Sequence, residues 1–165
     1  MKLGDGVEVA IHCVATLAGL EPGAAMPASA LADFHGVSQS YLLKHLAKLT
    51  DAEILTSASG PSGGYQLARP ADRITLADIV VAVEGQQPAF RCAEIRKRGG
   101  NPLPDNAYPL PCGINRAMLR AERVYRSALA EVRLSDIVEE FVSESDPRVI
   151  ARGCAFLEAN QRRRK

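Results

Sequence analysis

The sequence predicts a mainly α-helical fold with a small β wing, in which a winged helix-turn-helix domain precedes a long amphipathic helix. Two observations carry this prediction. Residues 38–69 contain an amphipathic helical pattern followed by a strand, a glycine-rich turn and a second strand, and residues 114–132 repeat apolar side chains at helical spacing. A helix, a strand, a flexible turn and a returning strand in this order are typical of a winged helix.

The first two predicted helices form the base of the winged domain. The apolar stripe of the first helix consists of Val7, Ala10, Ile11, Val14, Leu17 and Ala18. A second, short helix over residues 29–34 is expected to end at Gly36, because glycine tolerates the left-handed conformation that follows many helices. A tight turn at Gly36 between two helices is typical of a helix-turn-helix.

The third predicted helix begins after Ser38, whose hydroxyl is expected to cap it. Its apolar positions are Tyr41, Leu42, Leu46 and Leu49, and its polar positions are Gln39, Ser40, Lys44, His45 and Lys48. This separation into two faces predicts that one side packs on the core while the other is exposed for recognition.

A hairpin is predicted after this helix. Ile54 and Leu55 begin its first strand, the turn has the sequence SGPSGG over residues 59–64, and Tyr65 and Leu67 alternate in the second strand. This turn is the expected wing. A further helix is predicted from Thr75, which stands at the N-cap position of the run TLADIVVAVEG.

Three motifs in register resemble the winged-helix transcription regulators typified by IscR and NsrR. They are SxxYLxxxLxxL at residues 38–49, SGPSGGYxLARP at residues 59–70 and xITLxDIVxAVEG at residues 73–85. The resemblance spans roughly residues 1–135. It implies a dimeric DNA-binding transcription regulator whose operator affinity is controlled by the presence or the redox state of a [2Fe-2S] cluster.

Candidate DNA contacts lie on the third helix and on the wing. They are Ser38, Gln39, Ser40, Tyr41, Lys44 and Lys48 on the helix, and Ser59, Gly60, Ser62 and Gly63 on the wing. In the family's better-known wings an arginine precedes the glycines and enters the minor groove, whereas this chain has Ser59 there. Specificity for double-stranded DNA is therefore expected to depend mainly on the helix in the major groove.

The distribution of charge gives only local support for DNA binding. Residues 1–85 contain five Lys or Arg against nine Asp or Glu, and residues 86–165 contain fifteen against ten. The local cations are Lys44, Lys48 and Arg69 in the first half, and Arg162, Arg163, Arg164 and Lys165 at the end. We therefore expect moderate, salt-sensitive DNA affinity, and the acidic first half leaves a protein–protein interaction module as an alternative.

Four cysteines in a chain without an apparent export signal favour metal or redox chemistry over structural disulfides. Cys13 and Cys154 are predicted to be buried packing residues. Cys92 and Cys112 bracket a segment rich in proline and glycine, and basic residues near Cys92 favour its thiolate form. This segment is expected to be either disordered or organised by something outside the helical pattern, and it is a candidate ligand loop.

Glu8 and His12 are the candidates for completing a metal site. They project within about 40 degrees of each other on the first helix, whereas Cys13 projects about 100 degrees away from His12. The resemblance implies that Cys92 and Cys112 hold an iron-sulfur cluster, and that an acidic ligand comes from the first helix of the partner subunit at a position similar to Glu8. The Glu and His pair and the two loop cysteines look most like the RsrR-like members of the family. We therefore expect a [2Fe-2S] cluster on these four residues.

Two alternatives to the cluster remain open. Zinc also accepts two thiolates with one imidazole and one carboxylate. A cluster-free switch, in which Cys92 and Cys112 form a disulfide, needs no metal. His35 and His45 lie in the helix-turn-helix and are expected to be surface or groove residues. The residue constellations of hydrolases and the phosphate loops of kinases are absent from the sequence, so no enzymatic activity is expected.

The long helix near the end of the chain has a single apolar stripe. It consists of Ile114, Met118, Ala121, Tyr125, Leu129 and Val132. By its pattern alone this stripe could pack within its own chain. The resemblance implies that the helix is a dimerisation helix, which pairs with its twin in a homodimer and presents two recognition helices to a two-fold related operator. Residues 147–157 are predicted to form a last helix, followed by a frayed basic end.

Four parts are thus predicted along the chain: a DNA-binding winged domain over 1–85, a cofactor-binding loop over 86–113, a dimerisation helix over 114–134 and a C-terminal helical segment with a basic tail over 135–165. Hydrophobic residues make up 47% of the chain and charged residues 24%, which is ordinary for a globular protein. No apolar run approaches the roughly 20 residues of a membrane span, and no signal peptide is evident. A cytoplasmic protein without membrane association is therefore expected.

Overall fold

The computed structural model describes residues 3–60 and 62–163 and is mainly helical. Its helices are α1 (Asp5–Ala18), α2 (Ala28–His35), α3 (Gln39–Asp51), α4 (Leu76–Glu84), α5 (Gly113–Glu131), α6 (Leu134–Glu144) and α7 (Pro147–Asn160). Its strands are β1 (Ala24–Ala25), β2 (Leu55–Ala58), β3 (Gly64–Leu67) and β4 (Arg162–Arg163), and its 3-10 helices are η1 (Ala71–Arg73), η2 (Ile95–Lys97) and η3 (Asp105–Ala107). The predicted fold class is confirmed.

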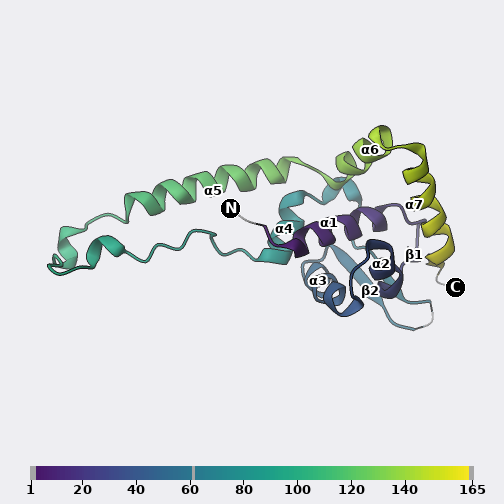
Figure 1. The fold of residues 1–165 in the computed structure, drawn as a ribbon, viewed down its shortest axis with the longest axis horizontal. Coiled ribbons are helices and arrows are strands. Elements are labelled where there is room, and N and C mark those ends of the chain that lie inside the picture. The colour runs from purple at the N-terminus through teal and green to yellow at the C-terminus, as the bar shows by residue number, and fades with distance from the viewer. Residues whose placement is uncertain (1–2, 61, 164–165) are drawn as a thin grey trace.

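These elements form a rounded unit with one long projection. In Figure 1, α1 to α4 and the wing strands make up the rounded unit, and α6 and α7 lie at its right-hand side. The segment before α5 and α5 itself extend to the left, away from this unit. Across the described residues, no helix has both the length and the apolar composition that crossing a membrane requires.

Local signals set the helix boundaries of the helix-turn-helix. Gly36 has φ 67° and ψ 32°, a left-handed conformation that glycine adopts readily, and it turns the chain from α2 into α3. Ser38 Oγ accepts a hydrogen bond from the backbone N–H of Tyr41 at 3.3 Å, so it caps α3 as predicted. Thr75 caps α4 in the same way, through a bond from the backbone N–H of Asp78. The backbone N–H of Thr75 in turn donates a hydrogen bond of 2.8 Å to the side chain of Asp78.

The core lies where α1, α3 and α4 meet. It contains Val7, Val14 and Leu17 of α1, Leu42, Leu46 and Leu49 of α3, and Ile79, Val80 and Val83 of α4. Met26, after β1, and Leu134, at the start of α6, also belong to it. Burial of each large apolar side chain contributes roughly 1.5–3 kcal/mol. Because each apolar set repeats every three to four residues, the same pattern determines helix formation and the buried face.

α1 and α3 approach each other closely at Gly6, where an added Cβ atom would overlap the imidazole ring of His45. His45 is half-buried there and lies edge-on to Tyr41, with ring centroids 4.7 Å apart. Both of its ring nitrogens are buried and have no hydrogen-bond partner among the described residues. Burial lowers the pKa of His45, and the positive charges of Lys48 and Lys44 lower it further, so the neutral ring is favoured.

His35 and His45 are therefore not the surface or groove residues that the sequence indicated. His35 is also half-buried, and its Nε2 atom lies 3.3 Å from the hydroxyl of Thr16 on α1. Its ring centroid is 5.9 Å from that of His12. Burial lowers the pKa of His35, and the neighbouring His12 lowers it further. The correction arises from the packing of α2 and α3 on α1, which no local pattern in either helix discloses.

The wing hairpin and the C-terminal strand lie on either side of β1. β2 and β3 pair in antiparallel register, with Leu55 opposite Leu67. Met26 and Tyr65 exchange two backbone hydrogen bonds of 2.9 and 2.8 Å, which connect the end of β1 to the hairpin. β4 pairs with β1 on its other side. Two short ladders are thus joined next to the wing.

Part of the basic C-terminus is ordered, which corrects the predicted frayed end. Arg162–Arg163 pair with β1 in antiparallel register, and the side chain of Arg163 forms an ion pair with Glu21. Arg164 and Lys165 lie outside the described residues. The positive charge of Arg163 is therefore partly neutralised by the protein itself.

α7 packs on α2 through an aromatic stack. The ring centroids of Phe34 and Phe156 are 4.1 Å apart, and the guanidinium of Arg152 lies 5.2 Å from the centroid of Phe34. Cys154 on α7 is exposed, so the prediction that it is buried was wrong. Cys13 is buried in the core as predicted, and burial raises the pKa of its thiol to about 12. Cys13 is therefore a packing residue.

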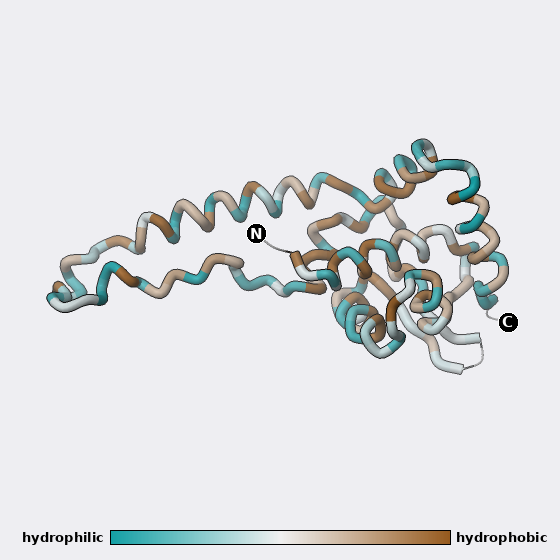
Figure 2. The backbone as a smooth tube through the Cα atoms, in the orientation of Figure 1, coloured by the Kyte–Doolittle hydropathy of each residue, from teal (hydrophilic) through white to brown (hydrophobic). Residues whose placement is uncertain are grey.

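The apolar stripe of α5 is divided between two surroundings. Tyr125 and Leu129 are half-buried and, with residues of α4, line a cavity of about 330 Å³. Ile114 and Met118, toward the outer end, are 67% and 43% exposed. Figure 2 shows hydrophobic and hydrophilic residues alternating along the projecting helix. The predicted single seam thus consists of an inner part that packs within the chain and an outer part that faces solvent.

Gly6→Ala is expected to destabilise the fold, because the added methyl group overlaps the His45 ring where α1 and α3 are closest. We expect the free energy of unfolding to fall by about 1–3 kcal/mol, as for other groups added to a packed interior. Urea denaturation followed by circular dichroism measures this loss.

Gly153→Ala is the matched control. Gly153 lies in α7 with open space around it, so alanine should stabilise that helix by up to about 1 kcal/mol. Introducing Gly6→Ala into a His45→Ala background should cost much less than introducing it into the wild type. An equal loss in both backgrounds would show that the ring is not the obstacle.

Candidate DNA-binding surface and two-cysteine site

The polar face of α3 is accessible in the first half of the helix. The exposed candidates are Ser38, Gln39, Ser40 and Lys44. Tyr41 is half-buried and packs against His45, so only part of its ring faces solvent. Side chains in the first turns of an exposed helix can reach base edges and phosphates in a major groove. The fold therefore leaves the predicted contact residues of this half-helix available to DNA.

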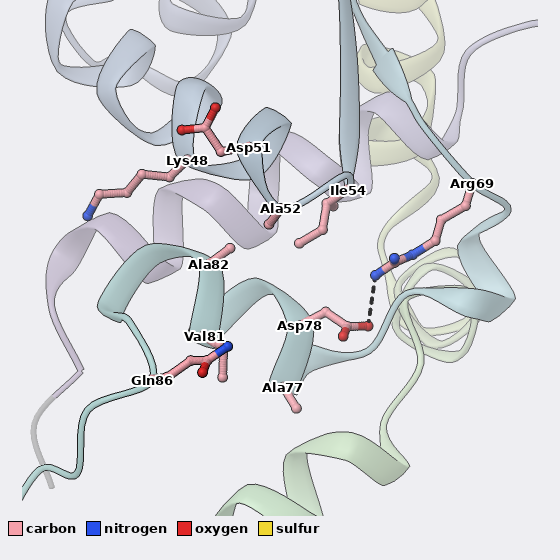
Figure 3. A pocket seen from close by; sticks show the side chains of 10 residues that line it. All are labelled: Lys48, Asp51, Ala52, Ile54, Arg69, Ala77, Asp78, Val81, Ala82 and Gln86. Carbon is pink, nitrogen blue, oxygen red and sulfur yellow. Dashed lines mark ion pairs between the residues drawn. The ribbon is translucent and has the colours of Figure 1, made fainter.

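Lys48 and Arg69, two of the predicted local cations, are engaged within the protein. Lys48 Nζ donates a hydrogen bond of 2.6 Å to the backbone oxygen of Val83 near the C-terminal end of α4, where a positive charge complements the helix dipole. Arg69 pairs with Asp78 at 3.2 Å. Both cations line a groove of about 510 Å³ between α3 and α4 (Figure 3). Lys48 thus links α3 to α4, and any DNA contact competes with that bond.

The backbone determines the shape of the wing turn. Ser59, Gly60 and Ser62 are exposed, whereas Gly63 is buried. Gly60 has φ +98°, and its backbone oxygen accepts a hydrogen bond of 2.9 Å from Gly63. A side chain at Gly63 would collide with the neighbouring backbone, so this glycine is required by the turn. Pro61 lies outside the described residues.

The segment between α4 and α5, residues 86–112, is the cysteine loop, and its own polar side chains hold its shape. Lys97 Nζ pairs with Asp105 at 2.8 Å and joins η2 to η3. The hydroxyl of Tyr108 donates a bond of 3.0 Å to the backbone oxygen of Arg96, whose guanidinium lies 5.0 Å from the Tyr108 ring centroid. Of the two expected possibilities, disorder or organisation by something outside the helical pattern, the second describes this loop, because η2, η3 and these polar contacts organise it.

Cys92 and Cys112 come together beside this network. Cys112 is the N-cap residue of α5, and its side chain makes no capping hydrogen bond. The backbone N–H groups of Asn115 and Ile114, the neighbouring thiol of Cys92 and the charge of Arg96 lower the pKa of the Cys112 thiol. The partial positive charge of a helix N-terminus also favours a thiolate. The pair is thus suited to metal ligation or to disulfide chemistry.

Glu94 lies between the two cysteines, although no sequence pattern singles it out. Its Oε1 atom is 3.9 Å from Cys92 Sγ and accepts a hydrogen bond of 3.4 Å from the backbone N–H of Cys112. Its Oε2 atom accepts a bond of 2.7 Å from Arg96 Nε. The hydrogen bond with Arg96 lowers the pKa of Glu94, which keeps the carboxylate ionised. A carboxylate two residues after a cysteine is not a recognisable motif, and its contact with Cys112 forms only when the loop folds.

Glu122 and Arg126 attach the first residues of the cysteine loop to α5. Glu122 is buried and pairs with Arg126 at 2.8 Å. It accepts a bond of 3.0 Å from the backbone N–H of Ala89, and Arg126 donates to the backbone oxygens of Gln86 and Gln87 at 3.4 and 3.2 Å. A buried carboxylate is tolerated when it is paired and hydrogen-bonded in this way. The pair determines the path of the chain as it leaves α4.

Glu8 and His12 are exposed on α1 and lie apart from the cysteines of the same chain. The 19 residues of α5 span about 28 Å; its inner end packs beside α4, and Cys112 is at its outer end (Figure 1). Within residues 3–60 and 62–163, no group of three or more His, Cys, Asp or Glu side chains is arranged to hold a metal ion. One protomer therefore assembles two of the four predicted ligands.

Residues 3–140 match the model of the Rrf2 family, which is described as an iron-dependent transcriptional regulator. The chain belongs to the Rrf2 family. It is 29% identical over 140 residues to YffB of Lactococcus lactis, named as an HTH-type transcriptional regulator, and the match covers 85% of this chain and 88% of YffB. It is 30% identical over 138 residues to Rv1287 of Mycobacterium tuberculosis, which has the same kind of name, covering 83% and 81%. This Rrf2 protein is thus a transcription regulator of a DNA-binding family.

Solved structures share the fold of this Rrf2 chain. IscR of T. potens superposes with a TM-score of 0.65 at 18% identity, covering 88% of this chain and 93% of IscR. CymR of B. subtilis, described as a global cysteine regulator, superposes with a TM-score of 0.63 at 19% identity, covering 88% and 99%. At these identities the similarity is one of fold. The resemblance to regulators typified by IscR is confirmed at the level of the family.

The donor set of the two-cysteine site fits half of an iron-sulfur site. Thiolates are the usual protein ligands of such clusters, and Cys92 and Cys112 lie together where α5 stabilises negative charge on sulfur. A [2Fe-2S] cluster has four protein ligand positions, so two ligands must come from outside the loop. Glu8 and His12 are exposed and chemically able to fill them, but only from another copy of the chain.

Replacing Gln39 and Lys44 by alanine is expected to weaken operator binding by about 1–3 kcal/mol for each lost contact, because both side chains are exposed in the first half of α3. Loss of Lys44 should also reduce the slope of log affinity against log salt by about one. Fluorescence anisotropy on an operator selected from genomic DNA, at several salt concentrations, measures both effects.

Arg148→Ala is the control for this experiment, since it removes an exposed cation from α7 and should leave DNA affinity unchanged. The double variant Gln39→Ala, Lys44→Ala should retain the wild-type unfolding curve. Unaltered affinity of the double variant at physiological salt would move the DNA contact away from α3.

Proposed function

We propose that this Rrf2 protein is a homodimeric regulator whose affinity for operator DNA is set by a [2Fe-2S] cluster. The proposed ligands are Cys92 and Cys112 of one protomer and Glu8 and His12 of the partner subunit. The observation that carries this proposal is that Cys92 and Cys112 both contact Oε1 of Glu94 at the outer end of α5. The described residues of one protomer form no group of three or more side chains that could hold a metal ion. Ligands from a second copy would complete the site.

The exposed part of α5 supports a second copy as the source of these ligands. Ile114 and Met118 present apolar side chains to solvent on a helix that projects from its own winged unit (Figure 2). A two-fold axis would let the two α5 helices pack through these side chains. Such a dimer would bring each Cys112 to the winged unit of the other copy, and it would present two α3 helices to a two-fold operator.

A bound cluster would supply a one-electron redox centre. The chain's own residues would tune its properties. Arg96 and the N-terminal amides of α5 stabilise negative charge on the sulfur of Cys112. Glu8 and His12 donate less electron density to iron than thiolates, which favours a higher reduction potential. His12 can also hold a proton on the ring nitrogen that is not a ligand.

α1 connects the proposed ligands to the DNA-binding helices. His12 lies beside His35 at the end of α2, and the next residue, Gly36, turns the chain into α3. Gly6, on the same helix as the ligands, lies against His45 of α3. Packed interiors have little free space, so a displacement of α1 must be accompanied by a displacement of α2 or α3. This packing supports control of DNA affinity by ligation at α1.

A thiol-disulfide switch is the second candidate mechanism. The contacts of both cysteines with Glu94 and the lowered pKa of Cys112 favour it, because a nearby thiolate is the species that forms a disulfide. Zinc on the same side chains is the competing metal. Iron, acid-labile sulfide, zinc and the visible spectrum of protein purified without oxygen distinguish these three forms.

The wild-type protein purified without oxygen is expected to be coloured and to contain about two iron and two sulfide per site. Cys92→Ala and Cys112→Ala should each abolish the colour, and the double variant Glu8→Ala, His12→Ala should lose or strongly destabilise it. Cys13→Ala and Cys154→Ala are matched controls that should leave iron content unchanged, since one thiol is buried in the core and the other lies on α7.

A mixed dimer tests whether the ligands come from two chains. One chain carries Cys92→Ala with Cys112→Ala, and the other carries Glu8→Ala with His12→Ala. Ligation across the dimer leaves one complete site, so the purified heterodimer should hold half the wild-type iron. A colourless heterodimer, or a wild type that contains only zinc or a disulfide, would contradict the proposal.

Ile114→Lys combined with Met118→Lys is expected to dissociate the homodimer, because two charges would enter an apolar interface. Light scattering measures the mass, and cooperative operator binding should be lost with the dimer. Arg116→Ala, on the opposite side of the same helix, is the control. Tyr125 is unsuitable for this purpose because it packs within its own chain. A double variant that keeps the dimer mass would place the interface elsewhere.

A further inference from the structure

Glu94 has an unusual backbone conformation. Its φ of 48° and ψ of 45° lie in the left-handed region, which L side chains rarely adopt. Its backbone oxygen accepts a hydrogen bond of 2.9 Å from Lys97, which closes the turn of η2. The left-handed conformation at Glu94 reverses the chain directly after Cys92. Residues in such sparsely populated backbone regions are often found at functional sites.

The carboxylate of Glu94 joins the two ends of the cysteine loop. Oε1 lies 3.9 Å from the thiol of Cys92, near the start of the loop, and 3.4 Å from the backbone N–H of Cys112, at its end. Oε2 is held by Arg96 at 2.7 Å. Arg96 in turn donates from Nη2 to the backbone oxygen of Leu110 at 2.6 Å. Two linked side chains thus fix both cysteines to the same short turn.

We propose that Glu94, held by Arg96, is a positioning residue that keeps the Cys92 and Cys112 thiols together before any cofactor binds. This inference deepens the proposed function and rests on it, because the two cysteines matter as cofactor ligands. Closing a flexible loop of about twenty residues costs conformational entropy, and a fixed contact at its base removes that cost from metal binding.

Glu94 acts through the cysteines and does not itself need to touch the cofactor. Both of its oxygens are already engaged, one by the backbone N–H of Cys112 and the other by Arg96. Neither of these two bonds requires a proton on a cysteine sulfur, so both persist when the thiols become thiolates. The contact of Oε1 with Cys92, in which the thiol is the donor, is lost when that thiol ionises, so the bond to the Cys112 N–H is the contact that serves both the metal-free and the loaded site.

The pairing of the thiols can be measured without any cofactor. In metal-free protein, Cys92 and Cys112 form a disulfide by releasing two protons and two electrons, which reduce one molecule of oxidised glutathione to two of glutathione. The equilibrium constant of this exchange reports how closely the fold holds the two sulfurs. A Cys154→Ser background removes the exposed thiol that would form mixed disulfides.

Glu94→Ala is expected to lower this equilibrium constant about tenfold, because the loop ends lose their shared contact. Arg96→Ala should act in the same direction. Glu94→Gln keeps the shape and the acceptor for the Cys112 N–H but loses the charge, so it should retain an intermediate value. Asp105→Asn is the matched control: it breaks the Lys97 ion pair in the same loop without touching either cysteine, and it should remain near the parent value.

The same variants are then reconstituted with iron and sulfide without oxygen. Glu94→Ala should incorporate less iron than Asp105→Asn at equal protein concentration. Identical disulfide equilibria for Glu94→Ala, Glu94→Gln and the parent would overturn the inference. A parent that binds no cluster would overturn the proposed function instead, and the metal-free disulfide comparison would still decide the role of Glu94.

Discussion

The close packing of α1 against α3 at Gly6 determines how the functional surfaces of this protein are arranged. Because Gly6 has no side chain, the ring of His45 fits between the two helices. The apolar stripe of α1 then faces the core, and Glu8 and His12 face outward beside the helix-turn-helix. Lys48, one turn further along α3, reaches the end of α4. One contact between helices therefore orients the DNA-binding helix, the candidate ligands and the start of the cysteine loop.

The two-cysteine site is stabilised differently from the core. Its side chains are half-buried or exposed, and ion pairs near the surface such as that of Lys97 with Asp105 each contribute only about 0–1 kcal/mol. The order of the loop therefore depends on several contacts with fixed ends. The buried Glu122 and its partner Arg126 hold one end, and the helical N-terminus at Cys112 holds the other. Between them, short polar contacts are sufficient to define a fold without a hydrophobic core.

The protein therefore consists of a packed unit and a projecting site. The unit formed by α1 to α4 has a continuous apolar core, whereas the outer part of α5 leaves Ile114 and Met118 in solvent. An Rrf2 protein built this way separates its own cysteines from its own α1 by most of the length of α5. One chain thus keeps its two cysteines apart from Glu8 and His12, which lie on α1, a helix that packs on α3.

Local signals in the sequence were enough to predict the helices of the winged domain, the caps of α3 and α4, the wing, α5 and the family, because each depends on residues close together in the chain. They did not predict the short strands β1 and β4, or α6 as a helix separate from α7. Ser38 and Thr75 cap helices through bonds from residues three positions away. Gly36 ends α2 in a left-handed conformation that glycine adopts readily, whatever its distant neighbours are. The pairing of Cys92 with Cys112 was also expected from the sequence, since both flank one irregular loop. The tertiary structure alone shows that His45 is half-buried with both ring nitrogens shielded from solvent, because this depends on the approach of two helices. It likewise decided that Glu94 lies between the thiols, since contacts between residues distant in the chain form only when the whole loop is folded.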